Sequence, residues 1–418
     1  MTTLDMVQRL QFNDRQAAEA LLLAFMQSEL GLNAVKVELR PLAVSLNSFN
    51  GFLTLENGTR LFFKTHTESD TIIAEYYNAA QLADAGYPVL QPIYSSTESG
   101  RQLLIYPVVN SPSVFDVAWA IEEGELTELA GLTLAQQATD DRLMQIYTNT
   151  LAPQGPHEAG SSPVHQLFHH RLASGRLERF YGPLPGVTGE SPSIELPDGE
   201  HAIREVRQVR WTINGQHYDE TLDDLIRRAL VLLEPAQSGP SVIGHGDAHN
   251  GNLFFVREAD PPHLMYFDPA FAGRHHPLLD LAKPLFHNVF AMWMYHAREK
   301  AADLTVTLHT EGDRWDIRHN YTLPPIREMF WSSKVERVLM PTLALLKQKG
   351  MLGEDWRAYL KASLFCCPFL TINLADPARF PPAITLLGLC MAVEMGAESY
   401  GEHSLLDRTL DNAERAIG

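Results

Sequence analysis

The residues with the clearest chemical potential lie in two neighbouring segments. Residues 242–255 read VIGHGDAHNGNLFF, and residues 265–270 read MYFDPA. Apolar residues flank the polar stretch 257–263, so the pattern predicts a loop that runs into a short hairpin. An acid stands at each end of this hairpin, Asp247 and Asp268. Such carboxylates can accept a proton or supply the oxygen ligands that Mg²⁺ prefers.

A zinc site is one interpretation of the first segment. His245, Asp247 and His249 alternate along the loop, and this spacing could hold zinc from one side, as in a metal hydrolase. That interpretation leaves Asn252 and Asp268 without a role. The zinc interpretation is therefore weaker than one that gives all of these residues a role.

The loop resembles the catalytic loop of the aminoglycoside phosphotransferase and choline kinase family, which follows the pattern H-G-D-x-H-x-x-N. Every fixed position of the pattern is filled, by His245, Gly246, Asp247, His249 and Asn252. Downstream, Asp268 and Asp280 stand where the family has its metal aspartate and a D-L-A motif. The segments around these two acids look nearest to the fructosamine-kinase and methylthioribose-kinase branches.

The resemblance implies an ATP-dependent phosphotransferase that acts on a hydroxyl of a small metabolite, such as a sugar, an amino sugar or an aminoglycoside-like compound. Asp247 would be the catalytic base that aims the attacking hydroxyl in line at the γ-phosphate. Asn252 and Asp268 would hold Mg²⁺ against ATP. His245 and Asp280 would support the catalytic loop structurally.

The first hundred residues contain the elements that such a loop requires beside it. Residues 51–56 and 59–65 are two strand-like runs joined by Asn57-Gly58, a dipeptide typical of a tight type I′ turn. The second run carries Lys64. The resemblance implies that Lys64 contacts the α- and β-phosphates of the nucleotide.

A helix over residues 72–85 follows this hairpin, and its first turn contains Glu75. The resemblance implies that Glu75 pairs with Lys64 and fixes its ammonium group. A loop over residues 45–51 would cover the phosphates, with Ser48 and Asn50 among its nucleotide-binding residues.

Two positions depart from protein kinases. Gly51 stands alone where a protein kinase has three loop glycines, so the glycine pattern does not identify the residue that touches phosphate. Pro269-Ala270 replaces the Phe-Gly that follows the metal aspartate of protein kinases. A proline there fixes φ, which indicates a metal site that is always formed rather than regulated.

The elements together predict an α+β, bilobal protein-kinase-like fold. Residues 1–108 would form an N-terminal helix and a nucleotide-binding lobe with a small antiparallel sheet and one main helix. Residues 109–418 would form a larger, mostly helical lobe that contains the catalytic loop (242–282). Clusters of Pro, Gly and Ser indicate an insertion at about 151–220, and almost everything after residue 285 looks helical. Two histidine pairs, His169-His170 and His275-His276, look like surface or substrate-rim residues.

Composition limits the partners. The 418 residues carry 33 Lys and Arg against 51 Asp and Glu, a net charge of −18, which disfavours nucleic acid and anionic membranes and favours a neutral or cationic substrate. The three cysteines include an adjacent pair, which suits neither a disulfide framework nor a metal site. The N-terminal residues contain no apolar signal segment, and the longest apolar stretch, 382–393, is shorter than a membrane span. We therefore expect a cytoplasmic protein.

Two other function classes remain as alternatives. A non-catalytic kinase-fold protein that binds nucleotide or a partner would have lost the base or the metal residues, and none is lost here. A protein kinase is disfavoured by the long insertion and by the absence of an A-P-E motif after Asp268. The sequence does not identify the acceptor, the position phosphorylated, the choice between ATP and GTP, or the oligomeric state.

Overall fold

The structure, a computed structural model, describes residues 2–40, 48–66, 78–96, 98 and 100–418. The chain divides into two compact units. Unit 1 consists of Met1–Pro112 together with Met265–Ala270, and unit 2 consists of Ser113–Leu264 and Phe271–Gly418.

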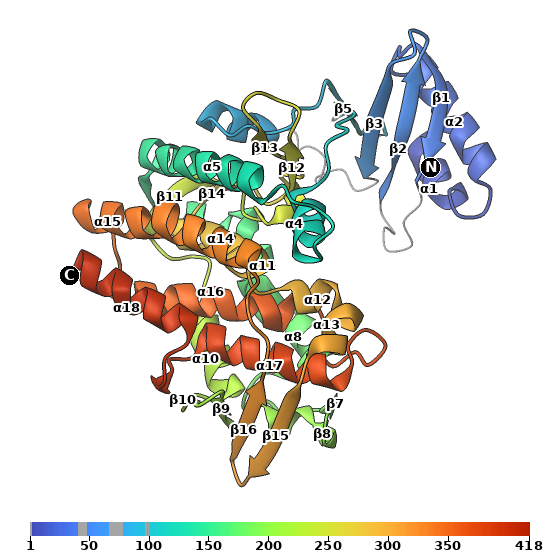
Figure 1. Ribbon diagram of the computed structural model, residues 1–418. Helices are drawn as coiled ribbons and strands as arrows, with labels where there is room; N and C mark the ends of the chain where they lie inside the picture. Colours follow the sequence, from blue (N-terminus) through green and yellow to red (C-terminus); the bar gives the residue numbers. More distant parts are fainter. Residues whose placement is uncertain (1, 41–47, 67–77, 97, 99) are drawn as a thin grey trace. The chain divides into compact units, whose positions relative to one another are not determined.

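Unit 1 contains a five-stranded sheet in which every neighbouring pair is antiparallel, in the order β1-β2-β3-β5-β4 (Figure 1). Its strands are β1 (Ala34–Leu39), β2 (Ser48–Leu55), β3 (Arg60–His66), β4 (Tyr94–Ser96) and β5 (Leu103–Pro107). Gly58 turns the β2–β3 hairpin with a φ of 82°, as its Asn-Gly signal predicts.

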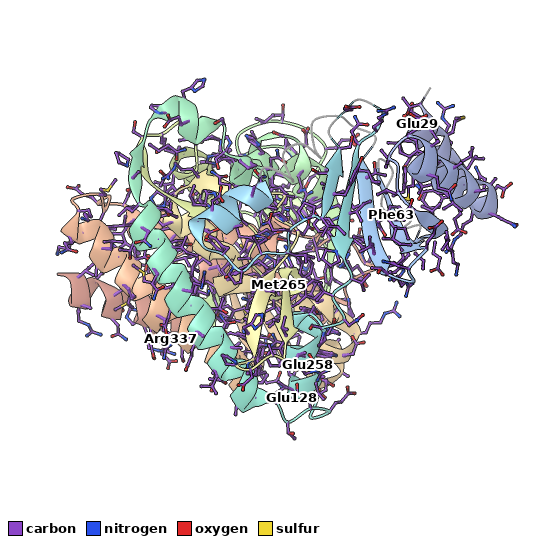
Figure 2. All side chains as sticks on the ribbon, turned by 90° about the horizontal axis from the view of Figure 1, so that it is seen from above. Glu29, Phe63, Glu128, Glu258, Met265 and Arg337 are labelled. Atoms are coloured by element: carbon purple, nitrogen blue, oxygen red, sulfur yellow. The ribbon has the colours of Figure 1, made fainter. Side chains whose placement is uncertain are left out.

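Two helices, α1 (Thr3–Leu10) and α2 (Arg15–Ser28), pack beside this sheet, and residues 78–85 form a further helical segment. Asp14 caps α2 by accepting a hydrogen bond from the backbone N–H of Ala17. Apolar side chains from both helices and from one face of the sheet form a single core, in which Phe63 is fully buried (Figure 2).

Two sequence-based boundaries in unit 1 are wrong. The predicted phosphate loop 45–51 overlaps β2, because Ser48 to Gly51 pair with residues 63–66 of β3. Glycine at position 51 allows β2 to lie close to both neighbouring strands. A Cβ there would lie 2.1 Å from the carbonyl oxygen of Glu38 in β1 and 2.9 Å from the ring of Phe63 in β3. The sequence also predicts a strand over residues 89–94, but β4 is shorter and begins at Tyr94, and residue 89 forms only an isolated bridge.

Unit 2 is mainly helical, with several small sheets between the helices (Figure 1). Its longer helices are α4 (Val114–Glu122), α5 (Leu129–Thr150), α10 (Leu222–Leu232), α11 (Pro277–His287), α14 (Pro325–Lys334), α15 (Met340–Gln348), α16 (Trp356–Leu370), α17 (Pro382–Gly396) and α18 (Leu405–Ile417). Shorter helical segments are α6 (Pro156–Gly160), η1 (Pro163–Leu167), α7 (His169–Ala173), α8 (Arg176–Tyr181), α9 (Ile203–Val206), η2 (Asn250–Asn252), α12 (Met292–Tyr295), α13 (Ala297–Asp303) and the π-turn η3 (Val335–Leu339). The predicted α+β class is therefore confirmed.

Some strands of unit 2 adjoin the predicted catalytic loop, and the others lie elsewhere in the chain. One sheet has the order β14-β11-β6, with β6 (Ala152–Gln154), β11 (Gly239–Gly244) and β14 (Gly273–His275). The pair β12 (Leu253–Val256) and β13 (His263–Tyr266) forms the hairpin predicted after the catalytic loop. The others are β7 (Ser193–Leu196), β8 (Gly199–Ala202), β9 (Arg210–Ile213), β10 (Gln216–Tyr218), β15 (Val306–Glu311), β16 (Arg314–His319) and β17 (Tyr400–Gly401).

Arg257 ties the end of β12 to the start of α5. Figure 2 shows Glu128 and Glu258 near one another at this place, and Arg257 forms an ion pair with each of them. Among the described residues, every helix is too short or too polar to span a bilayer.

Two predictions about unit 2 are wrong. The sequence predicts one short helix over residues 163–180, but the structure has three shorter helical segments there, because Phe168 leaves the helical region and Gly175 adopts a φ of 85°. The region after residue 285 is not entirely helical, since the hairpin β15–β16 interrupts it. Its strand β16 pairs in parallel with β9, a long-range contact that local periodicity does not reveal.

A partly buried acid on α17 predicts a pH effect on stability. Burial raises the pKa of Glu394 to about 7, and the negative charge of Asp407 adds to this, whereas Lys361 opposes it. The pKa of Glu394 is higher in the folded state than in the unfolded state. Its contribution to stability is therefore fully present at pH 4 and is lost as the pH rises through 7. We expect Glu394→Gln to raise the free energy of unfolding at pH 8 by roughly 2 kcal/mol.

Urea denaturation of both proteins between pH 4 and pH 8 measures this effect. The difference between variant and wild type should shrink towards zero at pH 4. Parallel curves for the two proteins would show that Glu394 is not responsible.

Candidate active site

The candidate catalytic loop follows β11 and depends on a glycine. Gly246 has a φ of 78°, and a Cβ at this position would lie 2.4 Å from the carbonyl oxygen of Phe271. Only glycine adopts this conformation without strain in so narrow a space. The turn it forms places Asp247 immediately beyond the end of β11.

Asp280, in the first turn of α11, stabilises this turn through hydrogen bonds. Its buried carboxylate accepts hydrogen bonds from the backbone N–H of Gly246 (2.6 Å), the hydroxyl of Tyr147 (2.5 Å) and Nε2 of His275 (3.0 Å). Burial raises the pKa of Asp280, but the hydrogen bonds outweigh it and leave that pKa below its usual value. Gly244 leaves room for the carboxyl group, since a Cβ there would lie 2.5 Å from its carbon atom.

His275 differs from the expectation drawn from the sequence. The sequence suggests a residue at the surface or at a substrate rim, but His275 is 1% exposed and supports Asp280. His245, predicted to support the loop, is also completely buried.

Asp247 presents its carboxylate beside two other polar residues of the loop. Its Oδ1 is buried without a hydrogen-bond partner among the described residues, and its Oδ2 lies 3.8 Å from Nε2 of His249. The backbone carbonyl of Asp247 accepts a hydrogen bond from Nδ2 of Asn252 at 2.9 Å. A buried carboxylate oxygen without a partner is costly unless a ligand satisfies it, so this oxygen of Asp247 could accept a hydrogen bond from a bound ligand.

Asn252 is oriented to offer an oxygen. Because its Nδ2 donates to the Asp247 carbonyl, its Oδ1 remains the group available to a cation. Within the described ranges, no group of three or more His, Cys, Asp and Glu side chains is arranged to hold a metal ion. The zinc interpretation of His245, Asp247 and His249 therefore lacks support.

Unit 1 brings together two residues that are 204 positions apart. Nζ of Lys64, on β3, lies 3.2 Å from Oδ1 of Asp268. Asp268 follows β13 with a φ of 53°, a conformation that non-glycine residues adopt mainly at turns and functional sites. The side chain of Asp268 is 44% exposed, so its carboxylate remains accessible.

The remaining predicted nucleotide residues are placed in part. Asn50 pairs directly with Lys64 across the β2–β3 ladder, so the two residues share one face of the sheet. Ser48 begins β2, but its side chain lies outside the described part of the structure. Glu75 lies outside the described residues.

Sequence reasoning missed a group of basic side chains next to the loop. His249 faces His287 with ring centroids 5.8 Å apart, and His287 in turn shares a hydrogen bond with Nζ of Lys283 at 3.2 Å. A signal was present in the sequence, because α11 is apolar except at Asp280, Lys283 and His287. This spacing of i, i+3 and i+7 places the three polar residues on one side of a buried helix.

Comparison with protein families gives one match. A family model described as "Phosphotransferase enzyme family" (APH) matches residues 38–305, which is more than half of the chain and contains all the predicted site residues. No curated protein matches the chain.

Several solved structures are similar to the chain at low identity. They include macrolide 2'-phosphotransferase MphH from Brachybacterium faecium (14% identity, 89% of this chain and 97% of that chain, TM-score 0.39). Another is a thermostable mutant of aminoglycoside phosphotransferase APH(4)-Ia in complex with ADP and hygromycin B (11% identity, 90% and 98%, TM-score 0.45). A third is described as a fructosamine-3-kinase from Thermobifida fusca (13% identity, 90% and 98%, TM-score 0.42).

Proposed function

Because the chain belongs to the phosphotransferase enzyme family, we propose that it transfers the γ-phosphoryl group of ATP to a hydroxyl of a small metabolite, such as a sugar, an amino sugar or an aminoglycoside-like compound. One observation carries the proposal: the loop turned by Gly246 contains a buried carboxylate oxygen of Asp247 that has no hydrogen-bond partner in the described part of the chain. A hydroxyl donor is the group that this oxygen lacks.

In the proposed reaction, Asp247 accepts a hydrogen bond from the acceptor hydroxyl and directs its oxygen at the γ-phosphorus. The new bond forms between this oxygen and phosphorus while the bond to the β-phosphate oxygen breaks, and ADP leaves. The proton of the hydroxyl passes to Asp247. The proton transfers late in the reaction, so a carboxylate is sufficient as the base.

Lys64 and Asn50 would bind the phosphates of the nucleotide from β3 and β2. Glu75 and Ser48 complete the proposed nucleotide site as the family resemblance implies. Asp268, next to Lys64 in unit 1, would face the same phosphates.

Asn252 and Asp268 would hold Mg²⁺ in the proposed reaction, because each carries a hard oxygen of the kind that Mg²⁺ prefers. Bound there, Mg²⁺ would neutralise charge on the phosphate oxygens. His245 and Asp280 would keep the loop in place during the reaction.

A screen of ATP turnover tests the proposal. Purified protein is incubated with ATP, Mg²⁺ and panels of sugars, amino sugars, sugar acids and aminoglycosides, and ADP formation is measured. We expect ADP formation that depends on one class of compound. Binding of ATP without turnover in any panel would favour the non-catalytic alternative.

Removal of the metal should abolish this activity. We expect excess EDTA to reduce ADP formation to background and added Mg²⁺ to restore it. Asp268→Asn should require roughly 10-fold more Mg²⁺ for half-maximal rate, since a charged oxygen ligand is replaced by a neutral one. Activity that persists in EDTA would contradict the assignment of Asn252 and Asp268.

A further inference from the structure

A group of basic residues lies next to Asp247 within unit 2. Nη1 of Arg171, on α7, and Nζ of Lys283, on α11, each lie 3.4 Å from the hydroxyl oxygen of Thr371 at the end of α16. Lys283 also contacts His287. We call Arg171, Lys283, His287 and Thr371 the cationic cluster.

Short contacts connect the cationic cluster to the proposed base. His249 is near both residues: its Nε2 lies 3.8 Å from Oδ2 of Asp247, and its ring centre lies 5.8 Å from that of His287. The negative charge of Asp247 raises the pKa of both Arg171 and Lys283 and so partly opposes the effect of burial. The cationic cluster is therefore part of the surroundings of the acceptor hydroxyl.

Arg171 and Lys283 form no ion pair with a carboxylate in the described part of the chain. Lys283 is 3% exposed. Nε of Arg171 is also buried without a described hydrogen-bond partner. Burial lowers the pKa of both groups, which expresses the cost of leaving them unpaired.

The end of α16 offsets only part of this charge. A helix C-terminus carries roughly half a negative elementary charge, whereas Arg171 and Lys283 together carry two positive charges when protonated. A buried cation is retained at such cost where it is paired or where a ligand completes it.

We infer that the acceptor substrate carries an anionic group, a carboxylate or a phosphate, which Arg171 and Lys283 bind while its hydroxyl faces Asp247. This inference rests on the proposed function and narrows it. It selects acidic or phosphorylated hydroxy compounds over amino sugars and aminoglycosides. The local charge thus reverses the preference for cations that the net charge of −18 indicates.

Calorimetry on the full chain tests the inference without knowledge of the natural substrate. The nucleotide site is first saturated with a non-hydrolysable ATP analogue and Mg²⁺. Glucose, glucosamine, gluconate and glucose 6-phosphate are then titrated as matched probes. We expect the two anions to bind at least roughly 10-fold more tightly than the neutral and cationic sugars, with the ratio between gluconate and glucose 6-phosphate distinguishing carboxylate from phosphate.

Two variants and a control locate the effect. Arg171→Gln and Lys283→Met should each weaken binding of the anions by roughly 10- to 100-fold, the range for a hydrogen bond between charged groups. Arg179→Gln, an exposed arginine on α8, should leave it unchanged. Lys283→Met should keep or raise the melting temperature, because it removes an unpaired buried charge.

A purely structural role predicts the opposite pattern. If Lys283 only stabilises the end of α16, Lys283→Met lowers the melting temperature and leaves anion binding intact. Equal or tighter binding of glucose or glucosamine, or no binding of either anion, overturns the inference while nucleotide binding remains as evidence for the proposed function. Failure to bind the ATP analogue would instead count against the proposed function itself.

Discussion

Replacement of Asp247 by asparagine is expected to lower the rate of phosphoryl transfer by a factor of about 10²–10⁴. Asparagine keeps the size of the side chain and its position after Gly246, but it cannot accept the proton of the attacking hydroxyl. Nucleotide binding should change little, because the proposed phosphate contacts come from Lys64 and Asn50 on other elements. Single-turnover kinetics and calorimetry with an ATP analogue measure the two quantities separately.

Asp141→Asn provides the matched control. Asp141 lies on α5, is 53% exposed and pairs with Arg337 at the surface. Surface ion pairs of this kind contribute little, so both rate and stability should stay near wild type. A rate for Asp247→Asn within a factor of about three of the control would exclude Asp247 as the base.

The loop can be located from the sequence because its constraints are local. Gly246 requires a positive φ, and the spacing between Asp247 and Asn252 is short enough that one turn sets their geometry. The approach of Lys64 to Asp268 is different, since the two lie 204 positions apart in the chain. Only the family resemblance predicts it, because no local pattern encodes such a contact.

The features that the sequence does not reveal depend on burial. Lys283 and His275 read as ordinary polar residues until their exposure is known, and the structure shows both almost fully buried. Arg171 lies in the short helix α7, whereas the sequence predicts one longer helix there. The direction of the Arg171 side chain could therefore not be predicted. The register of β2 is likewise hidden, because Gly51 looks like a loop residue and instead permits close approach of Glu38.

Net charge is a poor guide to the substrate for the same reason. The excess of acidic residues is distributed over the surface, and salt at physiological strength screens such charges beyond about 8 Å. A ligand in the site responds mainly to groups within that distance. Because Asp247 interacts electrostatically with Arg171 and Lys283, we expect these two cations to affect a bound acceptor more strongly than the formal charge of −18 does.

Asp280→Asn is expected to lower the free energy of unfolding by roughly 3 kcal/mol, the magnitude for breaking a buried hydrogen-bonded charge. Three donors converge on this carboxylate, from Gly246, Tyr147 and His275. The amide of asparagine would turn an N–H group towards at least one of them. Tyr147→Phe removes a single donor and should cost about 1–2 kcal/mol. Urea denaturation of the variants at pH 7 measures both values.

The pH dependence of the unfolding free energy distinguishes loss of the negative charge of Asp280 from a change in the packing around it. Burial raises the pKa of Asp280 and the hydrogen bonds lower it further than burial raises it, so the folded pKa lies below the unfolded value of about 4. The stabilisation is therefore complete above pH 4 and is lost as the pH falls through the folded pKa. The difference in unfolding free energy between wild type and Asp280→Asn, the gap, should be constant from pH 5 to pH 7 and should narrow below pH 4. Asp313→Asn changes a largely exposed side chain, so it should show neither the gap nor its narrowing. A gap that persists unchanged at low pH would mean that packing around Asp280, rather than its charge, holds Gly246 in place.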